Sequence, residues 1–218
     1  MMSRAGDVLT RRAIWLAVVL AVIPVGPAWA GPATDQLRRS VDQAVAILYD
    51  PALAVPAKAT ERRAAIRKVA QGIFDFPEMS RRSLGQHWHK LDEADRQEFS
   101  QLFSQLLERA YASRIEHYEG EHVAYVGETV APDGTIATVN TKIAPRNGTP
   151  VPIEYHLLRR GDRWLVYDLF IEGVSLVANY RVQFDRVLRT GTYDDLLKRM
   201  RVREGELSRP PAGTGRGS

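Results

Sequence analysis

A carboxylate within an apolar stretch is the strongest candidate for chemistry in this sequence. Asp168 lies in the run from Trp164 to Ile171, on the same side of a predicted strand as Trp164, Val166 and Phe170. A carboxylate buried among such groups must be paired, protonated or functional. Arg181 falls within the apolar arc of the next predicted helix, and a buried cation also needs a partner. The sequence therefore predicts a structural ion pair between Asp168 and Arg181. The alternative is that Arg181 contacts a phosphate at the mouth of a cavity.

The histidines do not form a metal-binding pattern. His87 and His89 are close in sequence, and His117 and His122 lie near the start of a predicted strand, but neither pair has a third ligand in register. The chain contains no Cys, which excludes thiol nucleophiles, cysteine zinc sites and disulfides. No glycine-rich phosphate loop follows a predicted strand, and Ser175 lacks the second glycine of a nucleophile elbow. We expect no metal and no cofactor.

The first thirty residues have the pattern of a secretory signal peptide. Arg11 and Arg12 precede an apolar run of 11 residues, 13–23, which is shorter than the roughly 20 residues that span a bilayer. Small residues at positions 28 and 30 predict cleavage near Ala30 and export out of the cytoplasm. The net charge of the chain is +4, and the leader supplies part of it. The remaining excess is too small to indicate a nucleic-acid groove.

The elements that must position Asp168 follow from hydrophobic periodicity and turn residues. Caps at Thr34, Thr60, Asp75 and Asp92 predict four helices, of which the last is the longest, about 93–118. Turn chemistry then separates four predicted strands, 121–130, 135–144, 150–159 and 163–171. Helices beginning at Ser175 and Thr192 follow, and residues 204–218 are expected to be disordered. This order predicts a single α+β domain, residues 31–203, with helices packed against a four-stranded twisted antiparallel sheet.

The predicted elements carry more apolar surface than a small core requires. The long helix has a broad apolar stripe, the second and third strands have one apolar face, and residues 164–171 are apolar on both faces. Such an excess either fills a dense core or surrounds an apolar ligand. We expect the sheet and helices to enclose an apolar pocket.

The predicted elements carry a set of short motifs. They are Phe74-Asp75-Phe76-x-x-Met79, Leu84-Gly85-x-x-Trp88, Phe99…Phe103…Leu107…Tyr111…Tyr118, Trp164-x-Val166-Tyr167-Asp168, Glu172-Gly173-Val174-Ser175-Leu176, and Asn179-Tyr180-Arg181 with Phe184. Together these motifs resemble the MlaC/toluene-tolerance family of periplasmic phospholipid carriers. The resemblance covers about residues 34–202, and its most specific part is the tract from Trp164 to Phe184.

The resemblance implies a soluble, monomeric carrier rather than an enzyme. Its cargo would be a phospholipid whose acyl chains lie in the pocket and whose head group faces outward. Its implied partners are an outer-membrane lipoprotein–porin complex and an inner-membrane ABC transporter with a periplasmic substrate-capturing ring. The implied role is maintenance of outer-membrane lipid asymmetry.

The lipid-lining residues are inferred from the direction that each side chain faces, not from the family. The most specific of these predictions is Val174, because it lies at the strand-to-helix turn, where the mouth of the pocket is expected. The expected lining residues are Leu107, Tyr111, Val139, Ile153, Tyr155, Val166, Val174, Val177 and Arg181.

Three alternatives remain open from the residues alone. The first is an isomerase or dehydratase on a cone-shaped scaffold, with Asp168, Tyr155 and Tyr111 as its acid–base set. The second is a binding protein for small aromatic solvents. The third is a structural partner of an envelope complex with a filled core.

Overall fold

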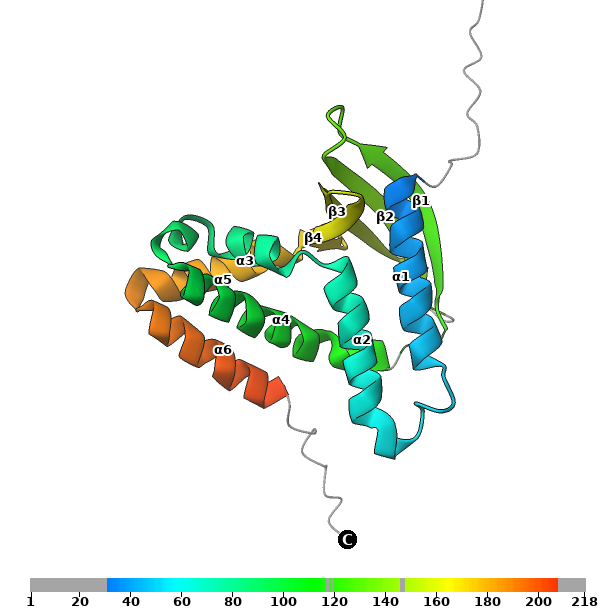
Figure 1. Cartoon of the computed structure of the whole chain (residues 1–218), viewed down its shortest axis with the longest axis horizontal. Helices are drawn as coiled ribbons and strands as arrows, with labels where there is room; N and C mark the ends of the chain where they lie inside the picture. Colours follow the sequence, from blue (N-terminus) through cyan, green and yellow to red (C-terminus); the bar gives the residue numbers. More distant parts are fainter. Residues whose placement is uncertain (1–30, 117, 119, 146–147, 208–218) are drawn as a thin grey trace, which may run out of the picture.

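The structure, a computed structural model, describes residues 31–116, 118, 120–145 and 148–207. The predicted signal peptide therefore lies outside the described residues. Six α-helices, two short 3-10 helices and five strands follow one another along this part of the chain (Figure 1). They are α1 (Pro32–Leu48), η1 (Pro56–Lys58), α2 (Ala59–Ile73), α3 (Phe76–Leu84), η2 (Gly85–Lys90), α4 (Glu93–Glu116), β1 (His122–Val130), β2 (Ile136–Ala144), β3 (Val151–Arg160), β4 (Arg163–Ile171), β5 (Val174–Ser175), α5 (Leu176–Thr190) and α6 (Tyr193–Leu207).

The strands form one antiparallel sheet in sequence order, β1-β2-β3-β4-β5. Gly134 and Gly161 occupy positive-φ positions in the turns after β1 and β3, which an L side chain adopts only with strain. The α+β class, the single domain and the four long strands are confirmed. The sequence missed β5, whose two residues pair with Phe170 and Ile171 at the end of β4.

A β-bulge in β4 changes which residues share a face. Leu157 pairs with Val166, whereas Tyr155, on the same face as Leu157, pairs with Leu169. Val166 and Leu169 are three residues apart, so one extra residue lies between them and reverses the alternation. Asp168 consequently lies on the face opposite Val166. The expectation that Asp168 shares the side of Val166 is therefore wrong, because strict alternation does not anticipate a bulge.

The hydrophobic core is divided into two clusters. The helical cluster comes from α3, α4, α5 and α6 and is built around Phe99, Phe103 and Phe184. The sheet cluster is formed by α1 with β2, β3 and β4, including Leu37. Phe74 and Leu169, the half-buried residues common to both, pack against each cluster. Figure 1 shows the same division, with α3 to α6 grouped together and α1 lying along the sheet.

Helix α1 is fixed to the sheet by polar contacts at its first turns. The carboxylate of Glu128 in β1 accepts a hydrogen bond from the backbone N–H of Thr34 at 2.7 Å. A negative charge at this position also interacts favourably with the positive end of the helix dipole. Gln36 bonds to the backbone of Trp164 at the start of β4. These contacts decide which part of the sheet face α1 covers.

The C-terminal boundary differs from the prediction. Helix α6 continues through residues 204–207, where disorder was expected. Leu207 packs against the helical cluster, and Glu204 accepts a hydrogen bond from Arg109 of α4, so this last turn has tertiary partners. The expectation for residues 208–218 lies outside the described residues. Among the helices described, none is both long enough and apolar enough to cross a bilayer.

Candidate functional site

One row of cross-strand neighbours crosses the whole sheet on the face toward α1. Tyr125 pairs with Thr141, Thr141 with Ile153, Ile153 with Ile171, and Ile171 with Val174. Side chains that are directly opposite in a sheet lie on the same face. We call these five residues the open row after its exposed end at Val174; Thr141, within the row, is buried.

Exposure on this face increases toward the open row. Ala137, Leu157 and Val166 form a row beneath α1 and are at most 1% exposed. In the open row, Ile153 and Ile171 are only half-buried and belong to neither core cluster, and Val174 is 62% exposed. Ile153, Ile171 and Val174 therefore form an apolar strip on the sheet face that neither cluster covers. Leaving such surface in water costs roughly 25 cal/mol per Å².

Two tyrosines place polar groups beside this strip. Tyr155 is half-buried next to the open row, and burial raises the pKa of its hydroxyl, partly offset by a hydrogen bond with Thr141. Burial likewise raises the pKa of Tyr125. Both side chains therefore stay protonated and neutral at ordinary pH. The strip is apolar with hydroxyl groups along one side, and it carries no charge of its own.

Asp168 serves the start of α5 rather than an ion pair. One of its oxygens, Oδ1, accepts hydrogen bonds from the backbone N–H groups of Leu169 at 2.8 Å and Val177 at 3.0 Å. The other oxygen, Oδ2, accepts from the hydroxyl of Ser175 at 2.6 Å, and that hydroxyl accepts from the N–H of Ala178 at 2.9 Å. The carboxylate thus satisfies donors that are unpaired at a helix N-terminus.

The predicted pair of Asp168 with Arg181 does not form. Arg181 is exposed on α5, and its guanidinium lies against the backbone of Gly85. Helix α5 begins at Leu176, so its N–H groups reach Asp168 first and replace the cation that the sequence assigned to it. The same geometry separates Asp168 from Tyr155, which lies on the opposite face of the sheet. The acid–base set of the enzymatic alternative is not assembled here.

His87 also has a structural partner. Its Nε2 lies 3.1 Å from Oδ1 of Asp185 in α5, and His89 is exposed. Within the described part of the chain, no three potential ligands gather into a metal site. His117 lies outside the described residues.

The expected lining residues are distributed over several environments. Leu107 and Val177 are buried in the helical cluster, and Val139 and Val166 in the sheet cluster. Tyr111 is half-buried at the edge of the helical cluster. Ile153 and Val174 lie in the strip, and Tyr155 lies directly beside it. Arg181 lies apart from the strip, on α5.

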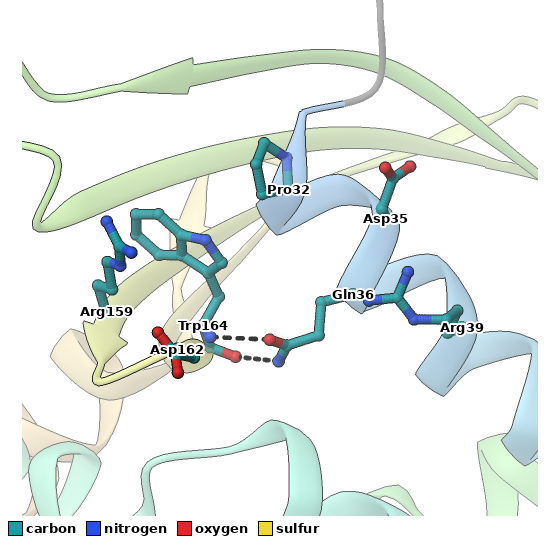
Figure 2. Close-up of a pocket in the computed structure, with 7 residues that line it drawn as sticks. All are labelled: Pro32, Asp35, Gln36, Arg39, Arg159, Asp162 and Trp164. Atoms are coloured by element: carbon teal, nitrogen blue, oxygen red, sulfur yellow. Dashed lines mark hydrogen bonds between the residues drawn. The ribbon is translucent and has the colours of Figure 1, made fainter.

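The two most pronounced hollows in the described part of the chain both lie away from the strip. The larger, about 400 Å³, lies between the start of α1 and the β3–β4 turn (Figure 2). Its lining is mostly polar: Pro32, Asp35, Gln36, Arg39, Arg159, Asp162 and Trp164. The smaller, about 180 Å³, lies where η2 meets the end of α5. Neither hollow includes an expected lining residue, so neither is the expected apolar pocket, and the strip is the candidate binding surface.

The sequence missed three residues of this region, Tyr125, Leu169 and Ile171. Each follows or borders a bulge: the register of β1 shifts between Tyr125 and Gly127, and that of β4 shifts before Leu169. A two-residue period without bulges assigns Leu169 and Ile171 to the wrong face. Because β4 is apolar on both faces, the alternation of its residues could not predict which side chains face α1. That property of the sequence was the available warning.

The fold and the strip define an α+β domain with an apolar candidate binding surface. The profile of the MlaC protein family matches residues 38–202, and the chain belongs to this family. Among curated relatives, the intermembrane phospholipid transport system binding protein MlaC of Haemophilus influenzae is 24% identical over 120 residues, which is 54% of this chain and 56% of that protein. The toluene tolerance protein ttg2D of Pseudomonas putida is 29% identical over 114 residues, 52% of each chain. The aligned stretch thus spans about half the length of these relatives.

A solved structure with the same fold covers more of the chain. It is a phospholipid-binding protein from Ralstonia solanacearum, determined in complex with a phospholipid. The TM-score is 0.67 at 26% identity, over 81% of this chain and 99% of that one.

Proposed function

We propose that this protein is a periplasmic phospholipid carrier. The observation that carries the proposal is the uncovered apolar strip, on a fold that in the Ralstonia solanacearum protein binds a phospholipid. The acyl chains would lie along the strip, between the sheet and the helical cluster, with the head group left in solvent. The proposed chemistry is reversible binding without bond making, a metal or a cofactor.

The physical need for a carrier follows from the cargo. Each buried CH₂ group is worth roughly 0.8 kcal/mol, so an acyl chain of ~16 carbons left in water costs on the order of 12 kcal/mol. Unassisted movement of such a lipid across an aqueous space is therefore very slow. A carrier removes the cost by offering an apolar surface of similar extent.

The proposed route connects the two membranes of a Gram-negative envelope. The partners we propose are an outer-membrane lipoprotein–porin complex and an inner-membrane ABC transporter with a periplasmic capturing ring. The names of the Haemophilus influenzae and Pseudomonas putida relatives support a transport system and a barrier function. A monomer with residues 1–30 removed would shuttle between these partners and maintain lipid asymmetry.

Native mass spectrometry of the full chain, expressed with its leader and purified from the periplasm, tests this function. The expected result is a complex heavier than the mature chain by the mass of one phospholipid, which solvent extraction then identifies. An empty protein that also fails to take fluorescent phospholipid from vesicles would overturn the proposal. Retention of toluene without phospholipid would favour the aromatic-solvent alternative instead.

A further inference from the structure

Tyr125 carries a buried hydroxyl group without a partner. The oxygen is closed to solvent, and no described residue forms a hydrogen bond with it. A buried donor left unpaired costs free energy, and native structures contain few such groups. The ring itself packs against the sheet cluster, so the side chain does not turn outward to reach water.

The position of the hydroxyl is held from two sides. Tyr125 is fixed in the sheet by its pairing with Thr141, next to the bulge in β1. Above the ring, the guanidinium of Arg38 in α1 lies 4.6 Å from the ring centre. A tyrosine has only two side-chain torsions, so these contacts determine where the hydroxyl points.

The neighbouring groups do not supply a partner. The hydroxyl of Tyr118 donates to the carbonyl of Glu121 at 2.6 Å, and that of Thr141 donates to the carbonyl of Ile153 at 3.3 Å. Burial, with nearby Tyr155 and the carboxylate of Asp42, raises the pKa of Tyr125. The phenol therefore keeps its proton at any physiological pH and offers a hydrogen-bond donor.

The donor lies at one end of the open row, whose other end is apolar. From Ile153 through Ile171 to Val174 the row carries hydrocarbon side chains alone. An acyl chain matches that stretch, but its only strong acceptor is the carbonyl oxygen of the ester that joins it to glycerol. A ligand that fills the strip and satisfies the donor must therefore combine a long hydrocarbon with a carbonyl group.

We propose that the Tyr125 hydroxyl donates a hydrogen bond to an ester carbonyl oxygen of the bound glycerolipid. This inference rests on the proposed phospholipid-carrier function and adds a specificity determinant to it. Recognition then operates at the ester linkage, with the head group left in solvent. A dialkyl ether lipid of equal length fits the strip equally well but leaves the donor unpaired.

A competition between ester and ether lipids tests the inference. Delipidated full-length mature protein is equilibrated with vesicles of diacyl and dialkyl phosphatidylethanolamine of equal chain length, and the bound lipids are quantified by native mass spectrometry. Wild-type protein is expected to prefer the diester by about tenfold, the ratio that corresponds to about 1.4 kcal/mol. Tyr125→Phe is expected to bind the diester less tightly, to bind the diether unchanged, and so to lose the preference.

Tyr49→Phe is the matched control, because Tyr49 is 53% exposed and packs edge-on against Tyr118. It is expected to keep the wild-type preference. Equal binding of the two lipids by wild type, or a preference that survives in Tyr125→Phe, would overturn the ester contact while leaving the carrier function standing. Failure of wild type to bind either lipid would overturn the carrier function and the ester contact together.

Discussion

The side chain of Gln36 forms two hydrogen bonds with the backbone of Trp164. The N–H of Trp164 donates to Oε1 of Gln36 at 2.9 Å, and Nε2 of Gln36 donates to the carbonyl of Trp164 (Figure 2). The amide thus pairs with the backbone of Trp164 as the backbone of a neighbouring strand would, and it attaches α1 to β4. It also helps to hold α1 over the buried rows of the sheet.

Gln36→Ala is therefore expected to lower the free energy of unfolding by about 2 kcal/mol, since two backbone groups at a half-buried site lose their partners. Urea denaturation monitored by circular dichroism measures the change. Gln43→Ala, at an exposed position of the same helix, serves as the control and should be close to neutral. Equal stability of the two variants would show that the amide contacts contribute nothing.

The Asp168 carboxylate is expected to contribute through the start of α5. Asp168→Asn keeps the shape but replaces one accepting oxygen with a donor, which should cost about 2 kcal/mol of unfolding free energy. Ser175→Ala removes the cap and should cost about 1 kcal/mol. The double variant should lose less than the sum of the two losses, because the two side chains are hydrogen-bonded to each other. Asp162→Asn, in an exposed turn, is the control, and a fully additive double variant would contradict the coupling.

Acid sensitivity is expected at Glu78. Burial opposes ionisation of this carboxylate, but hydrogen bonds and charge from Arg81 and Arg82 outweigh burial and hold its pKa below the ordinary 4.5. A depressed folded-state pKa contributes stability that is present above the unfolded pKa and is lost as the pH falls through the folded pKa. Wild type should therefore lose stability below pH 4.5.

Glu78→Gln should lose less stability over that acid range, because it has no carboxylate to protonate. Thermal melts of the two proteins are compared between about pH 3 and pH 7, a range that includes the ordinary pKa of a carboxylate. Glu61→Gln is the control, since Glu61 pairs with Lys58 at an exposed site. A pH profile for Glu78→Gln that matches wild type would contradict this assignment.

Val174→Glu is expected to reduce lipid binding without unfolding the protein. The side chain is 62% exposed, so a glutamate is tolerated in the empty protein. An acyl chain lying along the open row would have to desolvate the new carboxylate, which should lower phospholipid retention by roughly tenfold or more. Val182→Glu, 60% exposed on α5, is the control for added charge. Wild-type lipid content in purified Val174→Glu would argue against the open row as the binding surface.

The sequence predicted most elements because turn residues and caps mark many of their ends. Two expected caps are wrong, since α1 begins at Pro32 and α2 at Ala59, so Thr34 and Thr60 lie inside these helices. The four long strands agree with their expected ranges to within about two residues, and Ser175 caps α5 as expected. The family resemblance is also confirmed by the profile match. These features depend on local spacing, which a single sequence contains.

The errors concern how elements meet. The bulge in β4 is not visible as a change in residue type, yet it turned Asp168 away from Val166 and brought Leu169 onto the inner face. The partner of Asp168 was the backbone of α5, and backbone groups carry no sequence signal. For the same reason β5 was missed, since it consists of two residues whose pairing depends on the end of β4.

A core in two clusters determines how the domain can change shape. Phe74 and Leu169 contact both clusters but are only half-buried, so separating the two halves disturbs less packing than opening either one. The hydrogen bonds of Asp168 with Ser175 and Val177 keep β4 joined to α5 at one end of that boundary. We therefore expect the boundary to widen about the β4–α5 junction while each half stays folded, which would let a large ligand enter and leave without global unfolding.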